Sequence, residues 1–565
     1  MSDLPRTMTA LALCLALAAP GHALAQTIAY GNSAGASEAD GEADDGKGEG
    51  RRAPRHGRVS LSPYIEAAQI VNAELTPGND VVTYSTIAAG IDASIQGRNN
   101  EAALSLRYER RIGWGKASDG DTVSGVARVS ASVVPNTLKI EAGALAARSR
   151  VESNGSSVLS PLVDGDAVSQ VYAIYAGPAL STRVGDVQVG ANYRIGYNRV
   201  ESPDAIVTAP GQTPVDVFDD SVVHSANISA GVKAGDMLPV GIGLGAGFYQ
   251  EDVSNLDQRV RDMNVRLDVT LPVSRDVALV AGVGYEDVEI SSRDALRDGN
   301  GVPVIGNDGR FATDKSVPRV MAYDVSGLIW DAGVIWRPSR RTAFEAHVGR
   351  RYGSTSVTGS FAYAPNDRSA LNISVYDNVS GFGGQVSRAL AELPTDFEAV
   401  RNPLTGDLTG CVASMEKGNC LLGVLGSVRS SAFRARGVSA SYGHTLGRMS
   451  AGIAAGYDRR RYIAAPGTVL AVANGLIDRN YWVSSYLTGR IGEQASWTTN
   501  AYVSWFDSGF AGTGDGTSYG TTASYNRNLS NKLSATVALG IDGISRETLE
   551  DVWSASALVG VRYRF

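Results

Sequence analysis

From Val59 onward the chain repeats one pattern, in which apolar residues stand at every second position in stretches of about ten residues. Residues 187–197 are the clearest case, because valine, alanine, tyrosine and isoleucine alternate there with polar residues or glycine. Side chains two residues apart on an extended chain share a face, so each stretch predicts a strand with one oily and one wet face. The same alternation runs through 87–95, 104–109, 123–133, 138–146, 263–273, 277–285, 449–457 and 533–541. The chain is therefore predicted to be all-β.

A soluble β-sandwich would alternate in the same way, and the connections separate the two cases. Tight turns are predicted at 97–100, 135–137, 181–185, 235–238, 274–276, 338–341, 365–368, 446–448, 492–494 and 529–531. Long polar links lie between them, at 115–122, 152–167, 201–220, 291–318, 380–429 and 464–478. Short and long connections that alternate regularly along the chain are typical of transmembrane barrels, which have short periplasmic turns and longer external loops. We expect an antiparallel barrel of about 22 strands in the cell outer membrane, an even number that returns the C-terminus to the periplasmic side.

The N-terminal region divides into two parts before the barrel, which is expected at 58–565. Residues 1–25 read as a signal peptide, with Arg6 before an apolar stretch and Ala23-Leu24-Ala25 before the cleavage point. Residues 26–57 are acidic and then basic, with few apolar residues, and are expected to form a disordered leader. Such a leader is too short for a plug domain, which favours an open or loop-plugged pore over a TonB-dependent receptor. Beyond the signal, no run of about 18 apolar residues predicts a membrane helix.

The last stretch, from Trp553 to Phe565, alternates up to a terminal aromatic residue. Tyr563 and Phe565 are predicted to form the signal that the outer-membrane assembly machinery reads. That machinery, together with outer-membrane lipid and lipopolysaccharide, is an expected partner.

Charged residues on the wet strand faces are the candidate functional residues. An arginine facing lipid at the midplane costs roughly 2–4 kcal/mol, so these side chains are expected to line the lumen. One interpretation is a cross-strand network that rigidifies the barrel, and the other is a channel lining that selects solutes. The lumen candidates are Arg107, Glu109, Arg111, Arg128, Lys139, Glu141, Arg194, Arg266, Asp268 and Glu345.

Other functional classes find little support in the sequence. The His residues that remain after signal cleavage, at 56, 224, 347 and 444, lack the short spacings of a zinc site, and neither a metal nor a cofactor is predicted. The glycines from Gly241 to Gly247 recur at period two, as in a strand, where a nucleotide loop would need a strand-to-helix turn. With a net charge of −7 and no basic tract, nucleic acid is not an expected partner. We predict no enzymatic activity, although a catalytic group at the barrel rim stays open as an alternative.

Cys411 and Cys420 are the cysteines that remain after signal cleavage. An even count in an exported chain favours a disulfide over a metal site or a catalytic thiol. Both lie in the longest external loop, 380–429, where a short helix is also predicted near residues 386–393. Loops of this length usually carry function or fold into the lumen.

Several short motifs resemble a family of barrels associated with the PEP-CTERM/exosortase system. They are Ser62-Pro63-Tyr64, Trp336-Arg337-Pro338-Ser339-Arg340-Arg341, Gly349-Arg350-Arg351-Tyr352, Arg401-Asn402-Pro403, Thr405-Gly406 and the pair Cys411 and Cys420. The resemblance implies an outer-membrane component linked to exopolysaccharide or surface-protein export. Relatives sometimes carry a YajC-type preprotein-translocase label, which names a small inner-membrane subunit with one spanning helix and does not suit these residues.

Three functions therefore stay open from the sequence. The chain could be a pore for polysaccharide or small solutes, including a general solute porin. It could be a structural or assembly barrel of a surface-export system, or an enzyme at the outer-membrane rim. The first two fit the residues better.

Overall fold

The computed structural model describes residues 58–97, 99–151, 157–158, 168–201, 220–366, 368–395, 397–413, 419–420, 431–509, 514–547 and 550–565. The predicted signal peptide (1–25) and the predicted leader (26–57) lie outside these ranges. No helix in the described ranges is long and apolar enough to cross a membrane.

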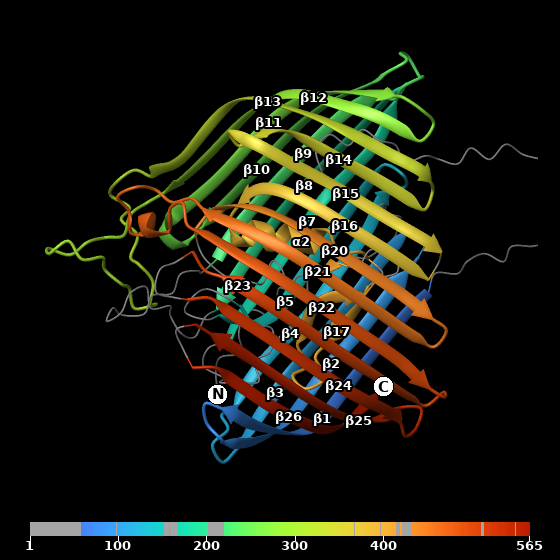
Figure 1. Ribbon diagram of the computed structural model, residues 1–565, viewed down its shortest axis with the longest axis vertical. Coiled ribbons are helices and arrows are strands. Elements are labelled where there is room, and N and C mark those ends of the chain that lie inside the picture. The colour runs from blue at the N-terminus through green and yellow to red at the C-terminus, as the bar shows by residue number, and fades with distance from the viewer. Residues whose placement is uncertain are drawn as a thin grey trace, which may run out of the picture.

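The chain forms one closed antiparallel β-barrel of 22 strands, as the alternation predicts (Figure 1). Closure comes from β1, which pairs with β2 on one side and with the last strand, β26, on the other. The barrel strands are β1 (Arg58–Thr76), β2 (Val81–Gln96), β3 (Asn100–Trp114), β4 (Gly120–Val134), β5 (Leu138–Val151), β7 (Val168–Val184), β8 (Val187–Glu201), β9 (Asp220–Val232), β10 (Gly241–Val253), β11 (Gln258–Pro272), β12 (Val277–Ser292), β13 (Val320–Ser339), β14 (Thr342–Arg351), β15 (Ser354–Asn366), β16 (Ser369–Ser380), β20 (Phe433–Leu446), β21 (Met449–Tyr462), β22 (Ile477–Ile491), β23 (Ala495–Asp507), β24 (Gly516–Asn528), β25 (Leu533–Arg546) and β26 (Val552–Arg564). The short β6 (Ser157–Val158) extends the edge of β5.

Tight turns gather at one end of the barrel and longer connections at the other. Leu446 pairs with Met449, which leaves a two-residue turn between β20 and β21. Gly447 opens that turn with φ +61°, a left-handed conformation that glycine adopts without strain. The chain enters β1 and leaves β26 at this same end, which is therefore the periplasmic end. The opposite end is external and carries the short helices η3 (Asn255–Asp257) and η4 (Val469–Ala473).

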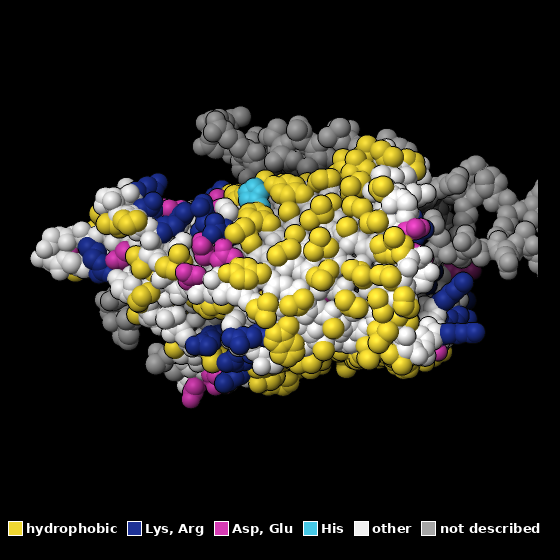
Figure 2. All heavy atoms as spheres, turned by 90° about the horizontal axis from the view of Figure 1, so that it is seen from above, with side chains coloured by type: hydrophobic (Ala, Val, Ile, Leu, Met, Phe, Trp, Pro, Cys, Tyr) yellow, Lys and Arg dark blue, Asp and Glu magenta, His cyan; other side chains and the backbone are white. Residues whose placement is uncertain are grey.

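The outer face of the barrel is an apolar belt (Figure 2). On β8, Tyr193, Ile195 and Tyr197 are 38%, 44% and 40% exposed, and the alternating residues face inward. A closed barrel satisfies its backbone hydrogen bonds within the wall and can present such a belt to lipid. This protein is therefore an outer-membrane β-barrel.

The longest connection, between β16 and β20, turns into the lumen. It contains the helix α2 (Phe382–Ala391), which Figure 1 places between the two sides of the barrel. The helix begins four residues before the start of the predicted range, 386–393, and ends two residues before the end of that range. Pro394 lies just beyond its end, and a residue before proline disfavours helical backbone, which stops the helix early. A small sheet of β17 (Glu398–Arg401), β18 (Leu408–Ala413) and β19 (Asn419–Cys420) follows.

The predicted disulfide remains a prediction, because the cysteine side chains lie outside the described residues. The backbone register of β18 and β19 places Cys411 directly opposite Cys420. Paired residues in antiparallel strands have Cα atoms roughly 4.5–5.5 Å apart, within the range of a disulfide. We expect alkylation and mass spectrometry of the oxidised protein to find no free thiol at either position, and two alkylated thiols would refute the bridge. Replacing both cysteines by serine should leave the barrel heat-modifiable while loosening this segment by about 2–3 kcal/mol.

Candidate functional site: the lumen and the segment inside it

The strand register places all the predicted lumen residues on the inward face of the wall. Arg107, Glu109 and Arg111 follow one another at period two along β3, opposite the outward side chains of Leu106 and Tyr108. Arg128, Lys139, Glu141 and Arg194 lie on β4, β5 and β8, and Arg266, Asp268 and Glu345 on β11 and β14. Ion pairs then gather most of these charges into separate clusters.

The first cluster lies where the two ends of the chain close the barrel. Arg107 donates to Glu66 on β1 and to Glu109, with N–O distances of 2.6 Å in both pairs. Arg562 on β26 also donates to Glu66. Arg111 lies over the ring of Tyr84, 4.5 Å from its centroid. Glu66 and Glu109 therefore neutralise much of the positive charge of Arg107 and Arg562 in this cluster.

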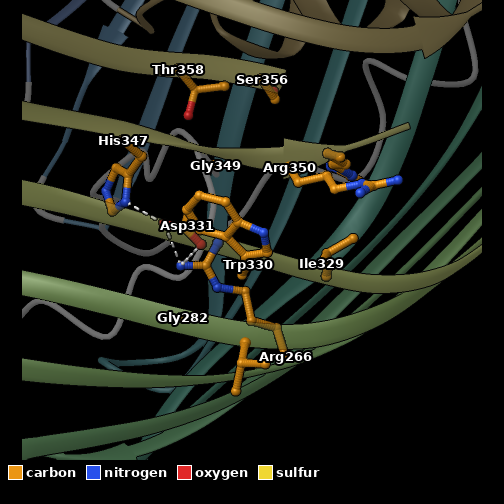
Figure 3. Close-up of a pocket in the computed structure, with 12 residues that line it drawn as sticks. Arg266, Gly282, Ile329, Trp330, Asp331, His347, Gly349, Arg350, Ser356 and Thr358 are labelled. Carbon is orange, nitrogen blue, oxygen red and sulfur yellow. Dashed lines mark hydrogen bonds and ion pairs between the residues drawn. The ribbon is translucent and has the colours of Figure 1, made fainter. Parts of the chain in front are cut away.

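The second cluster lies on β11, β13 and β14 and lines a pocket in the wall (Figure 3). Arg266 donates to Asp268 at 2.5 Å and to Asp331 at 2.7 Å. His347 contacts Asp331 through Nδ1 at 2.8 Å and Glu345 through Nε2 at 3.0 Å. Both ring nitrogens thus face carboxylates, and neither is left to activate the hydroxyls of Ser356 or Thr358 in the same pocket. This geometry argues against a Ser/His or Thr/His catalytic group here.

The other described histidines pair elsewhere. His224 meets Tyr193 at 2.8 Å on the outer face, and His444 meets Ser369 at 2.7 Å beside a periplasmic turn. Among the described residues, no group of three His, Cys, Asp or Glu side chains could hold a metal ion.

The N-terminus of α2 is held by a carboxylate of the wall. Glu251 on β10 accepts hydrogen bonds from the backbone N–H of Gly381 at 2.7 Å and of Gly384 at 3.0 Å. Tyr249 donates to the same carboxylate at 2.6 Å. A negative charge at a helix N-terminus satisfies free N–H groups and opposes the positive end of the helix dipole.

The C-terminus of α2 is held by an arginine of the wall. Arg128 donates to the carbonyl oxygen of Leu390 at 3.3 Å and to that of Ala391. Glu141 lies 3.6 Å from the same guanidinium and 3.3 Å from that of Arg194. The predicted lumen residue Arg128 therefore binds the negative end of the helix, and Glu251 and Arg128 together fix the direction of α2.

Between these two anchors the helix packs on an apolar patch of the wall. Phe382, Val386 and Leu390 recur every four residues, so they form one stripe of the helix. All three are fully buried against inward side chains of β3–β10. The wall residues of this patch are Ala103, Val126, Leu145, Ala147, Val171, Ala173, Tyr175, Val200 and Val253.

After α2 the chain runs through the lumen to its periplasmic end and then returns toward the external end. Thr395 donates to Glu101, next to the periplasmic turn before β3, at 2.7 Å. Arg401 then donates to Ser124 on β4 at 2.7 Å. Finally Asp407 pairs with Arg148, near the external end of β5, at 2.7 Å. Residues 381–408 thus follow the wall from the external rim toward the periplasm and back.

Sequence reasoning missed the residues that hold this segment, namely Glu251, Arg148, Arg401 and Asp407. One signal was present, because inward positions of a barrel should be polar, whereas Val126, Leu145, Val171 and Val200 are apolar. Such a patch on the wet face indicates that something apolar covers it from inside the lumen.

The predicted assembly signal lies at the end of β26. The rings of Tyr563 and Phe565 meet edge to face with centroids 5.3 Å apart, and both side chains are exposed. We expect replacement of both by serine to leave export intact and to lower the amount of inserted barrel severalfold, because the last strand loses its aromatic end. The amount of inserted barrel is measured from the band shift between unheated and heated samples of outer-membrane fractions on gels. Equal amounts of inserted barrel for the double mutant and the native protein would contradict the assignment.

Comparison with known proteins finds only distant structural likenesses. No family model matches the sequence, and no curated protein does. The FrpB iron transporter from Neisseria meningitidis is similar over 89% of this chain and 82% of its own, with 10% identity and a TM-score of 0.44. The ferric-catecholate import receptor Fiu from E. coli K12 matches over 89% and 81%, with 10% identity and a TM-score of 0.41. OccK5 (OpdH) from Pseudomonas aeruginosa matches over 89% and 98%, with 9% identity and a TM-score of 0.26. Likenesses at this level carry nothing about function.

Proposed function

We propose that this barrel is a channel of the outer membrane whose bore is narrowed by its own residues 381–408. The observation that carries the proposal is the pair of anchors on α2, a carboxylate at its N-terminus and an arginine at its C-terminus. A segment that served only to rigidify the wall would not need a helix whose two ends are recognised separately. Such anchors hold the folded helix in one position and direction against the wall.

The inward face of β23 and β24 favours a solute that is polar and uncharged. The inward side chains of residues 498–504 on β23 and of 518–524 on β24 are hydroxyls, amides or glycine. The amide nitrogen and oxygen of Asn500 and the hydroxyls of Tyr502 and Thr522 are buried in this wall and have no hydrogen-bond partner within the part of the chain that the structure describes. Neighbouring donors and acceptors without charge match the hydroxyl groups of a saccharide better than an ion.

We assign the channel to exopolysaccharide or surface-protein export on the motif resemblance, and this wall favours the polysaccharide. The same features would also suit a general porin for neutral sugars. The alternatives differ in size of cargo, which the experiment below separates.

Single-channel recording in planar bilayers tests the proposal. We expect the purified barrel to conduct, and neutral dextran oligosaccharides to block the current more often in the native protein than in the Asn500→Ala, Thr522→Ala variant. Short oligosaccharides that block without passing indicate a polymer channel, and short ones that pass indicate a porin. Absence of current in the native protein and also in a variant without the lumen segment would leave the structural-barrel hypothesis.

A further inference from the structure

The outer face of β21, β22 and β23 carries aromatic rings just below its external rim. These strands lie side by side in the wall (Figure 1). Tyr457 on β21 is directly opposite Tyr481 on β22, and their ring centroids are 4.8 Å apart. Trp505 on β23 continues the row, and Tyr481 and Trp505 are each 43% exposed. Exposed aromatic girdles of this kind mark the level of the lipid headgroups.

A row of arginines lies two residues further toward the external end. Arg459 is directly opposite Arg436 on β20 and Arg479 on β22, with no register shift between this row and the aromatic one. Residues two apart on a strand share a face, so these guanidiniums point outward like Tyr457 and Tyr481. Arg461 follows Arg459 on the same face and is exposed.

Half of this arginine patch lacks a carboxylate. Arg479 pairs with Asp507 at 2.5 Å, and Arg436 pairs with Asp377 at 3.2 Å. In the described parts of the chain, Arg459 and Arg461 form no ion pair with any carboxylate. These two arginines are two residues apart on one strand, so their Cα atoms are about 7 Å apart. Their positive charges repel each other unless an anion lies between them.

On β3, β8 and β11, outward arginines near the external rim are matched by carboxylates. Arg110 pairs with Asp121 at 2.7 Å, and Arg199 pairs with Glu201 at 3.1 Å. On β11, Arg259 pairs with Asp252 at 2.6 Å and Arg261 with Glu289 at 2.7 Å. The outward face of β20–β22 therefore differs from that of β3, β8 and β11 in carrying two neighbouring arginines without a carboxylate partner among the described residues.

We propose that Arg459 and Arg461, flanked by Arg436 and Arg479, bind the phosphate groups of lipopolysaccharide in the outer leaflet. Guanidinium binds phosphate with paired, charge-assisted hydrogen bonds. The patch faces lipid and lies at headgroup level on the external side, where the phosphorylated sugars of lipid A are found. Lipid A carries its phosphates on a rigid disaccharide, so one molecule presents anions to neighbouring arginines while its acyl chains cover the apolar belt below.

Native mass spectrometry of the full-length barrel in detergent, titrated with bisphosphorylated lipid A, tests this site. We expect the Arg459→Gln, Arg461→Gln variant to bind on the order of tenfold more weakly, because two charge-assisted contacts are lost. The matched control is Arg259→Gln, Arg261→Gln on β11, which removes two outward rim arginines that already have carboxylate partners. We expect this control to bind like the native protein.

A second arm uses only the native protein and so does not depend on how a variant folds. Dephosphorylated lipid A should bind on the order of tenfold more weakly than the bisphosphorylated form, and phosphatidylglycerol should compete poorly because it presents a single phosphate. Equal binding of the phosphorylated and dephosphorylated lipids, or an equal loss in the β11 control, would overturn the proposal.

Discussion

Replacing residues 381–432 by the dipeptide Asn-Gly is expected to raise the single-channel conductance severalfold. Ser380 and Phe433 are paired directly across β16 and β20, so a two-residue turn can join them without changing the register. The deletion removes α2 and the rest of residues 381–408 from the lumen, while all barrel strands keep their partners. Conductance in planar bilayers, recorded after unheated gels have verified a folded barrel, measures the effect.

The matched control shortens another external connection. Replacing residues 296–312 of the link between β12 and β13 by Asn-Gly keeps the bridge from Ala295 to Thr313 and leaves the lumen segment in place. We expect this variant to conduct like the native protein. A barrel without residues 381–432 that conducts no better than this control would show that the segment does not limit the bore.

The barrel could be predicted from the sequence because its determinants are local. Each strand shows its two faces within a few residues, as Val187–Glu201 does, and each tight turn lies directly between two such strands. A barrel also pairs neighbours in the sequence, so strand order followed from chain order except for the closure of β1 on β26.

The contents of the lumen could not be predicted, because their contacts join distant parts of the chain. Asp407 is 259 residues from Arg148, and Gly381 is 130 residues from Glu251. Nothing in the local pattern distinguishes Glu251, which binds a helix, from Glu345, which binds a histidine of its own strand. Charge on the wet face indicates that a residue faces inward, and only the fold reveals its partner.

The lumen charges are expected to differ widely in their effect on stability, according to how deeply they are buried. Arg266 and Asp268 are each 5% exposed and Asp331 is 11% exposed, so water screens their attraction poorly. Replacing Arg266 by methionine keeps most of the side-chain volume but takes the guanidinium away from Asp268 and Asp331, and only Asp331 keeps a contact with His347. Breaking a buried pair in this way costs about 3–5 kcal/mol.

We therefore expect Arg266→Met to lower the free energy of unfolding by about 3–5 kcal/mol, measured by urea unfolding of the barrel in lipid vesicles. The matched control is Arg259→Met on the same strand, whose pair with Asp252 has 41% and 31% of its side chains exposed. An exposed pair of this kind contributes about 0–1 kcal/mol, so the control should unfold nearly like the native barrel. Adding Asp268→Asn to Arg266→Met should restore part of the loss, because one uncompensated carboxylate disappears. Equal small losses in both single variants, with altered ion selectivity in Arg266→Met alone, would instead make this cluster a charged lining of the channel.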